Sequence, residues 1–236
     1  MPPSADVCIV VPTYNEKGNV VPLVEAIERT GVPGLLVLFV DDSSPDGTAD
    51  EIKRISQSRP WVKVLVRRGE RGFSSAYQDG LAEALREIKP QILVGMDADL
   101  QHPPSVIPAL VSAIKGGADL AVASRYIPGG GIMGWSRARR IVSRGANTYA
   151  RLLLDLPVRD ATSGFKAYNS QAAESVARAD LHAKRFEFQV AALNVLKGKR
   201  IVEVPYVFVA RKVGQSKFEL SDILRFIFSV ARMAIG

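Results

Sequence analysis

The feature that most constrains the fold is a repeated alternation of short apolar runs with longer amphipathic segments. Runs rich in β-branched residues recur at Val7–Val11, Leu35–Val40, Val62–Val66, Ile92–Met96 and Leu120–Ala123. Between them, apolar residues spaced three to four apart predict helices at Val20–Arg29, Ala49–Gln57, Ser74–Lys89 and Ser105–Lys115. Continuous apolar strands that alternate with such helices predict an α/β fold, with a mainly parallel sheet flanked by helices on both faces.

The pattern changes after Ser124, although nothing marks a new domain. A strand is expected at Ile201–Ala210, and helices are expected at Arg137–Leu154, Gln171–Ala179 and Phe186–Leu196. No internal repeat or low-complexity linker separates this half from the first. We therefore expect one domain over residues 1–220, followed by a C-terminal amphipathic helix over residues 221–236.

The last segment has a wide apolar face that is bordered by Arg225 and Arg232. Such a helix is expected to lie in a membrane interface, with a core helix or a subunit contact as the alternative. No run reaches the ~18 uninterrupted apolar residues that a spanning helix needs, so no integral span is expected. The start, Met1–Asp6, has no basic segment and does not resemble a signal peptide.

The charge balance predicts an anionic partner. With 31 Lys and Arg against 24 Asp and Glu, the net charge is +7, which suits nucleic acid, an anionic membrane or a phosphorylated substrate. The basic residues of the second half lie beside acids at strand ends, which favours phosphorylated small molecules over nucleic acid. The single cysteine, Cys8, lies in an apolar run and should be buried, and a reducing, intracellular compartment is expected.

Ligands of open α/β sheets bind beyond the carboxyl ends of the strands, so the segments that leave the strands are the candidate site. The first of them, Pro12–Gly18, lacks the glycine fingerprint of a dinucleotide site, which argues against an oxidoreductase with a nucleotide cofactor. Tyr14 could stack on a base and Glu16 could accept from a ribose or base. A turn with a helix cap at Asn15 or Asn19 is the alternative.

The second exit, Asp41–Gly47, carries two adjacent acids at the end of a buried strand. A carboxylate in this place suits a ribose hydroxyl or a base N–H. The residues Asp46 and Thr48 could instead serve only as caps of the next helix.

The third exit, Asp97–Pro104, carries the strongest signal. In an extended segment, Asp97, Asp99 and Gln101 would project to one side. This oxygen-only set suits Mg²⁺ or Mn²⁺ shared with a substrate pyrophosphate, and does not suit zinc. The adjacent His102 is expected to support or pack rather than bind the metal. Farther along, Arg125 follows a strand, and Arg211 with Lys217 occupies a glycine-containing loop that could fold over a phosphate.

Several segments together resemble a known family. They are Val-Pro-Thr-Tyr-Asn-Glu (11–16), Val-Asp-Asp-Ser-Ser-Pro-Asp-Gly-Thr (40–48), Asp-Ala-Asp-Leu-Gln-His-Pro-Pro (97–104), Ser-Arg-Tyr (124–126), Ile-Val-Ser-Arg-Gly-Ala-Asn (141–147) and Asp-Ala-Thr-Ser-Gly-Phe-Lys-Ala-Tyr (160–168). Further matching segments are Arg-Phe-Glu-Phe-Gln (185–189), Val-Pro-Tyr-Val-Phe-Val (204–209) and Gly-Gln-Ser-Lys (214–217). The chain resembles the inverting family-two glycosyltransferases of GT-A (Rossmann-like) fold, and among them the dolichol-phosphate or polyprenol-phosphate mannose synthases.

The resemblance implies a donor site for GDP-mannose made of Pro12, Tyr14, Glu16, Val40, Asp42, Asp97, Ala98, Asp99, Gln101, Arg125, Lys184, Arg211 and Lys217. It implies a metal site, for Mg²⁺ or Mn²⁺, at Asp97, Asp99 and Gln101. It also implies catalytic roles for Asp99, Arg125, Arg139 and Ser143, of which Arg139 and Ser143 would hold the acceptor phosphate.

The reaction implied by the resemblance is transfer of one mannose from GDP-mannose to dolichyl or polyprenyl phosphate with inversion. The Gln-x-x-Arg-Trp signature of processive synthases is missing after Gln189, which favours a single transfer. A glucosyltransferase that uses UDP-glucose and a non-catalytic nucleotide-sugar-binding subunit are the alternatives. The expected partners are a membrane surface or a membrane-anchoring subunit, on the cytoplasmic face of a membrane (the endoplasmic reticulum in a eukaryote).

Overall fold

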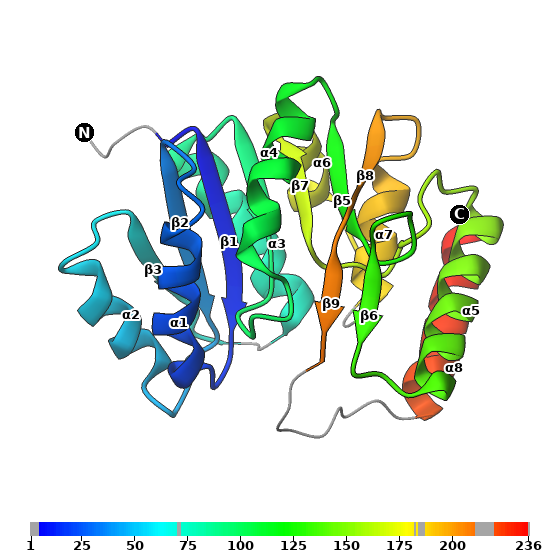
Figure 1. The fold of residues 1–236 in the computed structure, drawn as a ribbon, viewed down its shortest axis with the longest axis horizontal. Coiled ribbons are helices and arrows are strands. Elements are labelled where there is room, and N and C mark those ends of the chain that lie inside the picture. The colour runs from blue at the N-terminus through cyan, green and yellow to red at the C-terminus, as the bar shows by residue number, and fades with distance from the viewer. Residues whose placement is uncertain (1–4, 70–71, 182, 184–186, 211–219, 236) are drawn as a thin grey trace.

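The computed structural model describes residues 5–235 apart from 70–71, 182, 184–186 and 211–219, and a seven-stranded sheet lies at the centre of this described part (Figure 1). The strands follow the order β3 (Val62–Val66), β2 (Leu35–Asp41), β1 (Val7–Thr13), β4 (Ile92–Gly95), β7 (Lys166–Asn169), β5 (Leu120–Ser124) and β8 (Ile201–Pro205). Every pair of neighbours is parallel except that β7 runs antiparallel to both β4 and β5. The short strands β6 (Gly131–Met133) and β9 (Val207–Val209) form a separate parallel pair.

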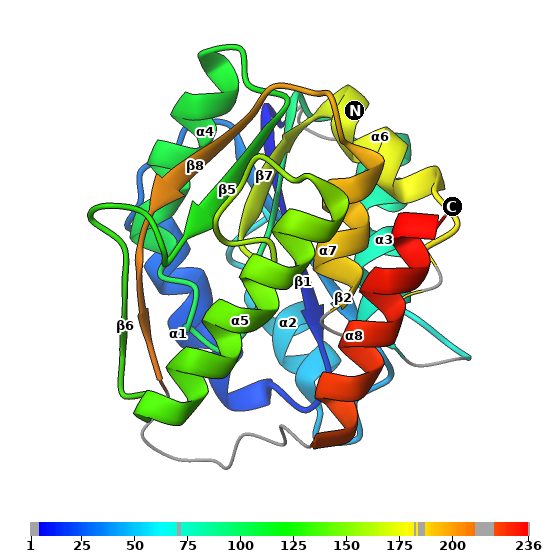
Figure 2. The same cartoon turned by 90° about the vertical axis from the view of Figure 1, so that its right-hand side faces the viewer.

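Helices cover both faces of the sheet. One face carries α1 (Lys17–Glu28), α2 (Thr48–Ser56) and α4 (Ile107–Lys115), which follows a 3-10 turn, η2 (Pro104–Val106). The other face carries α3 (Phe73–Glu83), which continues into a π-helical turn, η1 (Ala84–Ile88), together with α6 (Ser170–Arg178) and α7 (Glu187–Val195). On that second side, α5 (Arg137–Leu154) and α8 (Leu220–Ile235) lie side by side (Figure 2).

Two apolar cores follow from the alternation of side chains along the strands. In β1, Val7, Ile9 and Val11 face the α1–α2–α4 layer, while Cys8 and Val10 face the layer that contains α3. All five side chains are fully buried. The prediction that Cys8 acts as a buried apolar residue is confirmed, and burial raises the pKa of its thiol to about 12.

The predicted fold class is confirmed, and the helix expected at Arg137–Leu154 has those bounds. One local expectation is wrong, and one strand was not predicted. The single strand expected at Ile201–Ala210 is divided at Tyr206, so that β8 belongs to the main sheet and β9 to the small one. The antiparallel strand β7 was not expected, because it has only four residues and contains Lys166. The division of the chain at residue 220 stays a prediction.

The approach of α3 to the sheet depends on a glycine. At Gly80 a Cβ atom would lie 2.5 Å from Val10 Cγ1 and 2.7 Å from Val40 Cγ2, on the side chains of β1 and β2. Real Cβ atoms do not come so close to branched side chains that are fully buried. The helix can therefore pack at this distance only because residue 80 has no side chain.

We predict that Gly80→Ala destabilises the fold by about 1–3 kcal/mol, because the added methyl group overpacks the contact between α3 and the sheet. Gly145→Ala is the matched control. Residue 145 is also helical and has nothing within 4 Å of its would-be Cβ, so the same change should be neutral or stabilise by up to about 1 kcal/mol. Urea unfolding of both variants measures the difference, and equal effects would contradict the proposed contact.

Candidate active site

The segments that leave β1, β2, β4 and β5 meet at one edge of the sheet. The strands β1, β2 and β4 are adjacent and parallel. The strand β5 has the same direction as β4, because β7 lies between them and is antiparallel to both. Their carboxyl ends therefore point the same way. The prediction that these four exits form one site is consistent with this topology.

The first two exits are tied together by hydrogen bonds between backbone and side chains. The N–H groups of Asn15, Glu16 and Lys17 donate to Ser44 Oγ, Thr48 Oγ1 and Asp46 Oδ2 at 3.0, 3.0 and 3.1 Å. The helix α1 begins at Lys17 without a side-chain cap, so the alternative in which Asn15 or Asn19 caps it is wrong. The two loops thus form one structured rim.

The predicted donor residues of this rim differ in exposure. The Tyr14 ring is 44% exposed, as a stacking surface requires, whereas Val40 is fully buried at the end of β2. Pro12 and Glu16 are half-buried. The Glu16 carboxylate accepts a hydrogen bond from the Asn19 side chain. Direct contact of these residues with a donor stays a prediction.

Asp42 is held by a residue that the sequence analysis did not single out. Its carboxylate pairs with Arg67 Nη1 at 2.5 Å and accepts from the Gly72 N–H at 2.9 Å. Arg67 also pairs with Asp79 through Nε at 2.8 Å. The Asp42 side chain is only 8% exposed. Asp42 therefore holds Arg67 and the backbone of Gly72 in place. A contact of Asp42 with a donor stays a prediction.

The third exit has a different backbone from the one expected. Residues 98–99 form a turn, and Leu100 has a φ of +62°, so the chain is not extended and the alternation argument for this segment is wrong. The Asp99 carboxylate accepts the Gln101 N–H at 2.9 Å, which is the local bond of an Asx turn. Asp99 and Gln101 are half-buried, and the Asp97 side chain is 40% exposed.

The chemistry of these side chains fits a hard divalent cation. Asp97 and Asp99 offer carboxylate oxygens and Gln101 offers an amide oxygen, which is the donor type that Mg²⁺ and Mn²⁺ take. Among the described residues, no group of three or more His, Cys, Asp or Glu side chains gathers to hold a metal. Two carboxylates with one amide oxygen suit an ion that keeps water and substrate phosphates as its other ligands.

His102 supports the turn from beneath. Its Nδ1 accepts the Asp97 N–H at 3.0 Å, so this nitrogen carries no proton. The ring is 4% exposed and stacks on Phe165 at a centroid distance of 5.1 Å. Burial, and next the positive charge of Arg125, lower the pKa of His102 to about 3. The expectation that His102 packs and supports is confirmed for this contact.

Arg125 is buried rather than presented to solvent. Its Nε and Nη2 donate to the two carboxylate oxygens of Asp160 at 2.7 and 2.6 Å, and Nη2 also donates to Thr162 Oγ1 at 3.0 Å. Burial alone would lower the pKa of Arg125, but the Asp160 carboxylate raises it above its usual value. The role predicted for Arg125 toward a donor is not tested by these contacts.

Arg139 and Ser143 lie close to Arg125 on the first turns of α5. The Arg139 guanidinium stacks 4.1 Å from the centre of the Trp135 ring, and the Arg125 guanidinium lies 5.6 Å from the centre of the same ring. Burial, and next Arg125, lower the pKa of Arg139. The hydroxyl of Tyr126 donates to Ser143 Oγ at 2.7 Å. The three predicted catalytic residues Arg125, Arg139 and Ser143 are thus brought together.

Tyr206 joins the acidic turn to this cationic group. Its ring packs edge-on against His102, with centroids 6.2 Å apart. Burial raises the pKa of Tyr206, and both Arg125 and Asp97 act on it electrostatically. The carboxylates of the third exit and the arginines that follow β5 therefore border the same aromatic cluster.

Four further residues are predicted to bind the donor. Lys184, Arg211 and Lys217 lie outside the described residues, and Ala98 is buried under the turn. A further pair was missed by the sequence analysis. Lys166 is fully buried and donates to the backbone oxygen and Oε1 of Gln189 at 2.7 and 2.9 Å. Burial lowers the pKa of Lys166 to about 7, against the opposing effect of Asp160.

An α/β sheet with an acidic turn and a cationic cluster beyond its strand ends is compatible with a transferase of the GT-A class. Comparison with known proteins gives the family. The profile of Glycosyl transferase family 2 matches residues 8–177, and the chain belongs to this family.

Curated relatives match nearly the whole chain. Polyprenol monophosphomannose synthase of Mycolicibacterium smegmatis is 38% identical over 99% of this chain and 88% of its own length. Dolichol-phosphate mannosyltransferase of Pyrococcus furiosus is 37% identical over 96% of this chain, which spans 63% of that protein. The enzyme of the same name from Saccharomyces cerevisiae is 34% identical over 95% of this chain and 85% of its own length.

Solved structures confirm the fold. Glucosyl-3-phosphoglycerate synthase from Mycobacterium tuberculosis superposes with a TM-score of 0.69 at 19% identity, covering 98% of this chain and 81% of that one. A complex of the same protein with Mn²⁺, UDP-glucose and phosphoglyceric acid gives a TM-score of 0.67 at 17% identity, covering 98% and 80%. At this identity the likeness concerns the fold alone.

We predict a pH-dependent contribution of His102 to stability. Because the folded state lowers the pKa of His102 from 6.5 to about 3, the unfolded chain binds the proton first. The contribution is complete above about pH 6.5 and is lost as the pH falls toward 3. Between pH 7 and pH 5 the loss should be about 2 kcal/mol.

His102→Phe provides the comparison. The variant keeps a ring against Phe165 but leaves the Asp97 N–H without its acceptor, so at pH 7 it should be less stable by about 1–3 kcal/mol. It has no imidazole to titrate, so the difference from the parent protein should shrink at pH 5. Urea unfolding at both pH values measures this, and a constant difference would contradict the buried neutral imidazole.

Proposed function

We propose that the protein transfers one mannose from GDP-mannose to a polyprenyl phosphate such as dolichyl phosphate, with inversion, giving polyprenyl phosphate β-mannose and GDP. The observation that carries the proposal is identity of 34–38% over at least 95% of the chain to proteins named as mannosyltransferases or synthases of this lipid class. The arrangement of the acidic turn and the cationic cluster supports it.

On the donor side, the exposed Tyr14 ring would stack on the guanine base, and Glu16 and Asp42 would accept from its N–H groups or from the ribose. The oxygens of Asp97, Asp99 and Gln101 would hold Mg²⁺ or Mn²⁺. When bound, this ion supplies charge neutralisation for the departing nucleotide diphosphate. The Asp99 carboxylate would face the diphosphate from the turn, and the hydrogen bond that it accepts from the Gln101 N–H holds it in this position.

On the acceptor side, the polyprenyl phosphate is already anionic at neutral pH, so no general base has to remove a proton from it. Arg139 would attract this phosphate, and its stacking on Trp135 limits the rotamers that the guanidinium can adopt. Ser143 would donate to the phosphate while its Oγ accepts from Tyr126. Orientation of the two substrates is then the main contribution of the chain.

We predict that Asp99→Ala lowers mannosyl transfer at least ~1000-fold, because it removes an oxygen ligand where charge develops. The fold should persist, since Asp99 is half-buried in a surface turn. Transfer of radiolabelled sugar to a short polyprenyl phosphate measures the effect. Asp50→Ala, which removes an 83% exposed carboxylate on α2, is the control and should leave transfer unchanged.

The same assay separates the alternatives. Transfer should require Mg²⁺ or Mn²⁺ and stop with EDTA, and GDP-mannose should be preferred to UDP-glucose. Preference for UDP-glucose would identify a polyprenyl-phosphate glucosyltransferase. Donor binding without product would identify a nucleotide-sugar-binding subunit. Full turnover with EDTA present would contradict the metal role of Asp97, Asp99 and Gln101.

The outer helices support association with a membrane surface. On α8, Phe226 and Val230 are buried against the protein, whereas Leu224, Phe228 and Ile235 are 52%, 72% and 89% exposed. The adjacent α5 adds the exposed side chains of Ile141, Leu152 and Leu153. In the described part of the chain, no helix has the length and apolarity to cross a bilayer. We infer peripheral binding at the cytoplasmic face, directly or through an anchoring subunit.

We predict that Phe228→Ser combined with Ile235→Ser weakens vesicle binding at least ~10-fold, because two exposed apolar side chains no longer enter the lipid interface. Cosedimentation with phospholipid vesicles measures binding. The melting temperature should not change, since neither side chain belongs to the core. Unchanged vesicle binding would favour recruitment by a subunit.

A further inference from the structure

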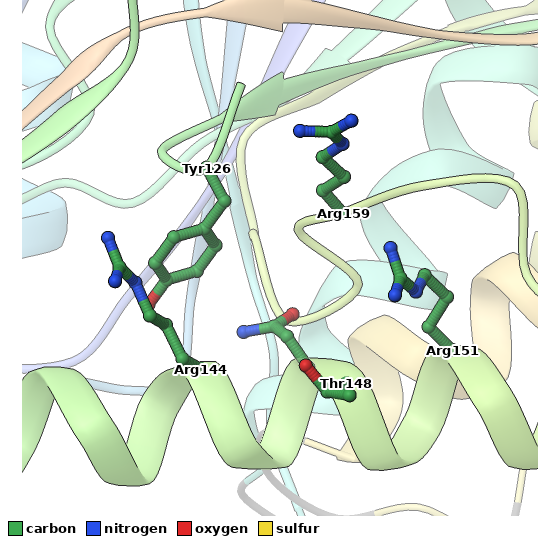
Figure 3. Close-up of a pocket in the computed structure, with 6 residues that line it drawn as sticks. Tyr126, Arg144, Thr148, Arg151 and Arg159 are labelled. Atoms are coloured by element: carbon green, nitrogen blue, oxygen red, sulfur yellow. The ribbon is translucent and has the colours of Figure 1, made fainter. Parts of the chain in front are cut away.

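A cavity lined by cationic side chains lies between α5 and the segments that follow β5 and α5 (Figure 3). Its volume is about 230 Å³, and it is lined by Tyr126, Arg144, Asn147, Thr148, Arg151 and Arg159. None of these residues is among those predicted to bind the donor or the acceptor. Tyr126 forms the boundary with the acceptor region, since its hydroxyl donates to Ser143.

Three arginine side chains, those of Arg144, Arg151 and Arg159, line the cavity. Arg144, Thr148 and Arg151 share one side of α5 because they are spaced by four and three residues, and Arg159 reaches the cavity from the turn beyond the helix. In the part of the chain that the structure describes, none of the three arginines lies within 4.0 Å of a carboxylate. Like charges held together in this way favour an anion between them.

The neutral lining residues have different tasks. The Asn147 side chain is occupied within the protein, since it donates to the Ser143 carbonyl at 2.9 Å and accepts the Thr162 N–H at 3.0 Å. It fixes the floor of the cavity. Thr148 is exposed beside the arginines and offers a hydroxyl. Guanidinium groups and a hydroxyl are the donors that phosphate oxygens accept from.

The size of the cavity selects a small anion. Sites for drug-sized ligands occupy roughly 300–1,000 Å³, so a volume of about 230 Å³ is small for a nucleotide. A single phosphate group is compatible with this volume. The neighbouring surface of α5 exposes Ile141 and Leu152, at 70% and 71%. A phosphate on a lipid headgroup could therefore enter from the same side as apolar chains.

We propose that this cavity binds a phosphate group, free in solution or on the headgroup of an anionic phospholipid, as a site separate from that of Arg139 and Ser143. The positive charge of the three arginines attracts the phosphate, and the side chains of α5 that line the cavity limit the size of the group that can enter. The proposal does not depend on the transfer reaction, and its test measures binding alone.

The test compares two double variants that each remove two positive charges. Arg151→Gln with Arg159→Gln changes the cavity. Arg86→Gln with Arg178→Gln is the control, since these side chains are 70% and 79% exposed and each pairs with a carboxylate three or four residues earlier in its own helical segment, away from α5. One arm titrates inorganic phosphate by calorimetry at low salt. The other measures cosedimentation with vesicles of phosphatidylcholine alone or with phosphatidylglycerol added.

The cavity variant should bind phosphate, or the anionic vesicles, at least ~10-fold more weakly than the control variant. Loss in the calorimetric arm identifies free phosphate as a ligand, and loss restricted to anionic vesicles identifies the lipid headgroup. Thr148→Glu places a carboxylate among the arginines at an exposed helix position and should reproduce the loss without unfolding the protein. Equal behaviour of the cavity and control variants in both arms would overturn the proposal.

Discussion

The buried ion pair between Arg125 and Asp160 is the interaction on which the organisation of the site depends. Two parallel hydrogen bonds join the groups, and neither side chain is more than 7% exposed. The pair ties the end of β5 to the segment that follows α5, and the Asp160 N–H continues the link to Glu203 on β8. Removing one partner of such a pair costs about 3–5 kcal/mol, because the other charge remains buried. Arg125 also donates to Thr162 Oγ1, which accepts from Asn147 of α5, so the pair is linked to the helix that carries Arg139 and Ser143.

Much of the fold could be predicted from the sequence because its strands and helices are locally encoded. The apolar runs and the spacing of apolar residues indicate β1 to β5 and α1 to α5 with bounds that differ by a few residues at most, provided that α3 is taken together with the turn η1 that continues it. The strand β7 could not be predicted, since it depends on pairing with β4 and β5 and on burying Lys166 against Gln189. That acceptor lies 23 residues away, and no local pattern indicates it.

The candidate site, like the fold, could be predicted from the sequence only in part. The positions of Asp42, Asp97 and Arg125 at strand ends follow from topology, so the sequence indicates where they lie. It does not indicate what holds them, because Arg67 is 25 residues from Asp42 and Asp160 is 35 residues from Arg125. The turn at the third exit could not be predicted either, because no sequence pattern indicates a positive φ at a leucine such as Leu100. The resemblance to a family supplied the roles of residues that spacing alone left undetermined.

The burial of Cys8 has a practical consequence for following this protein in solution. It is the only cysteine of the chain, it has no exposed surface, and its raised pKa keeps the thiolate scarce at neutral pH. Thiol-reactive dyes and spin labels should therefore not react with Cys8 in the folded protein. A cysteine introduced on the outer side of α8 becomes a unique attachment point, which allows fluorescence or paramagnetic measurements without first removing a native reactive cysteine.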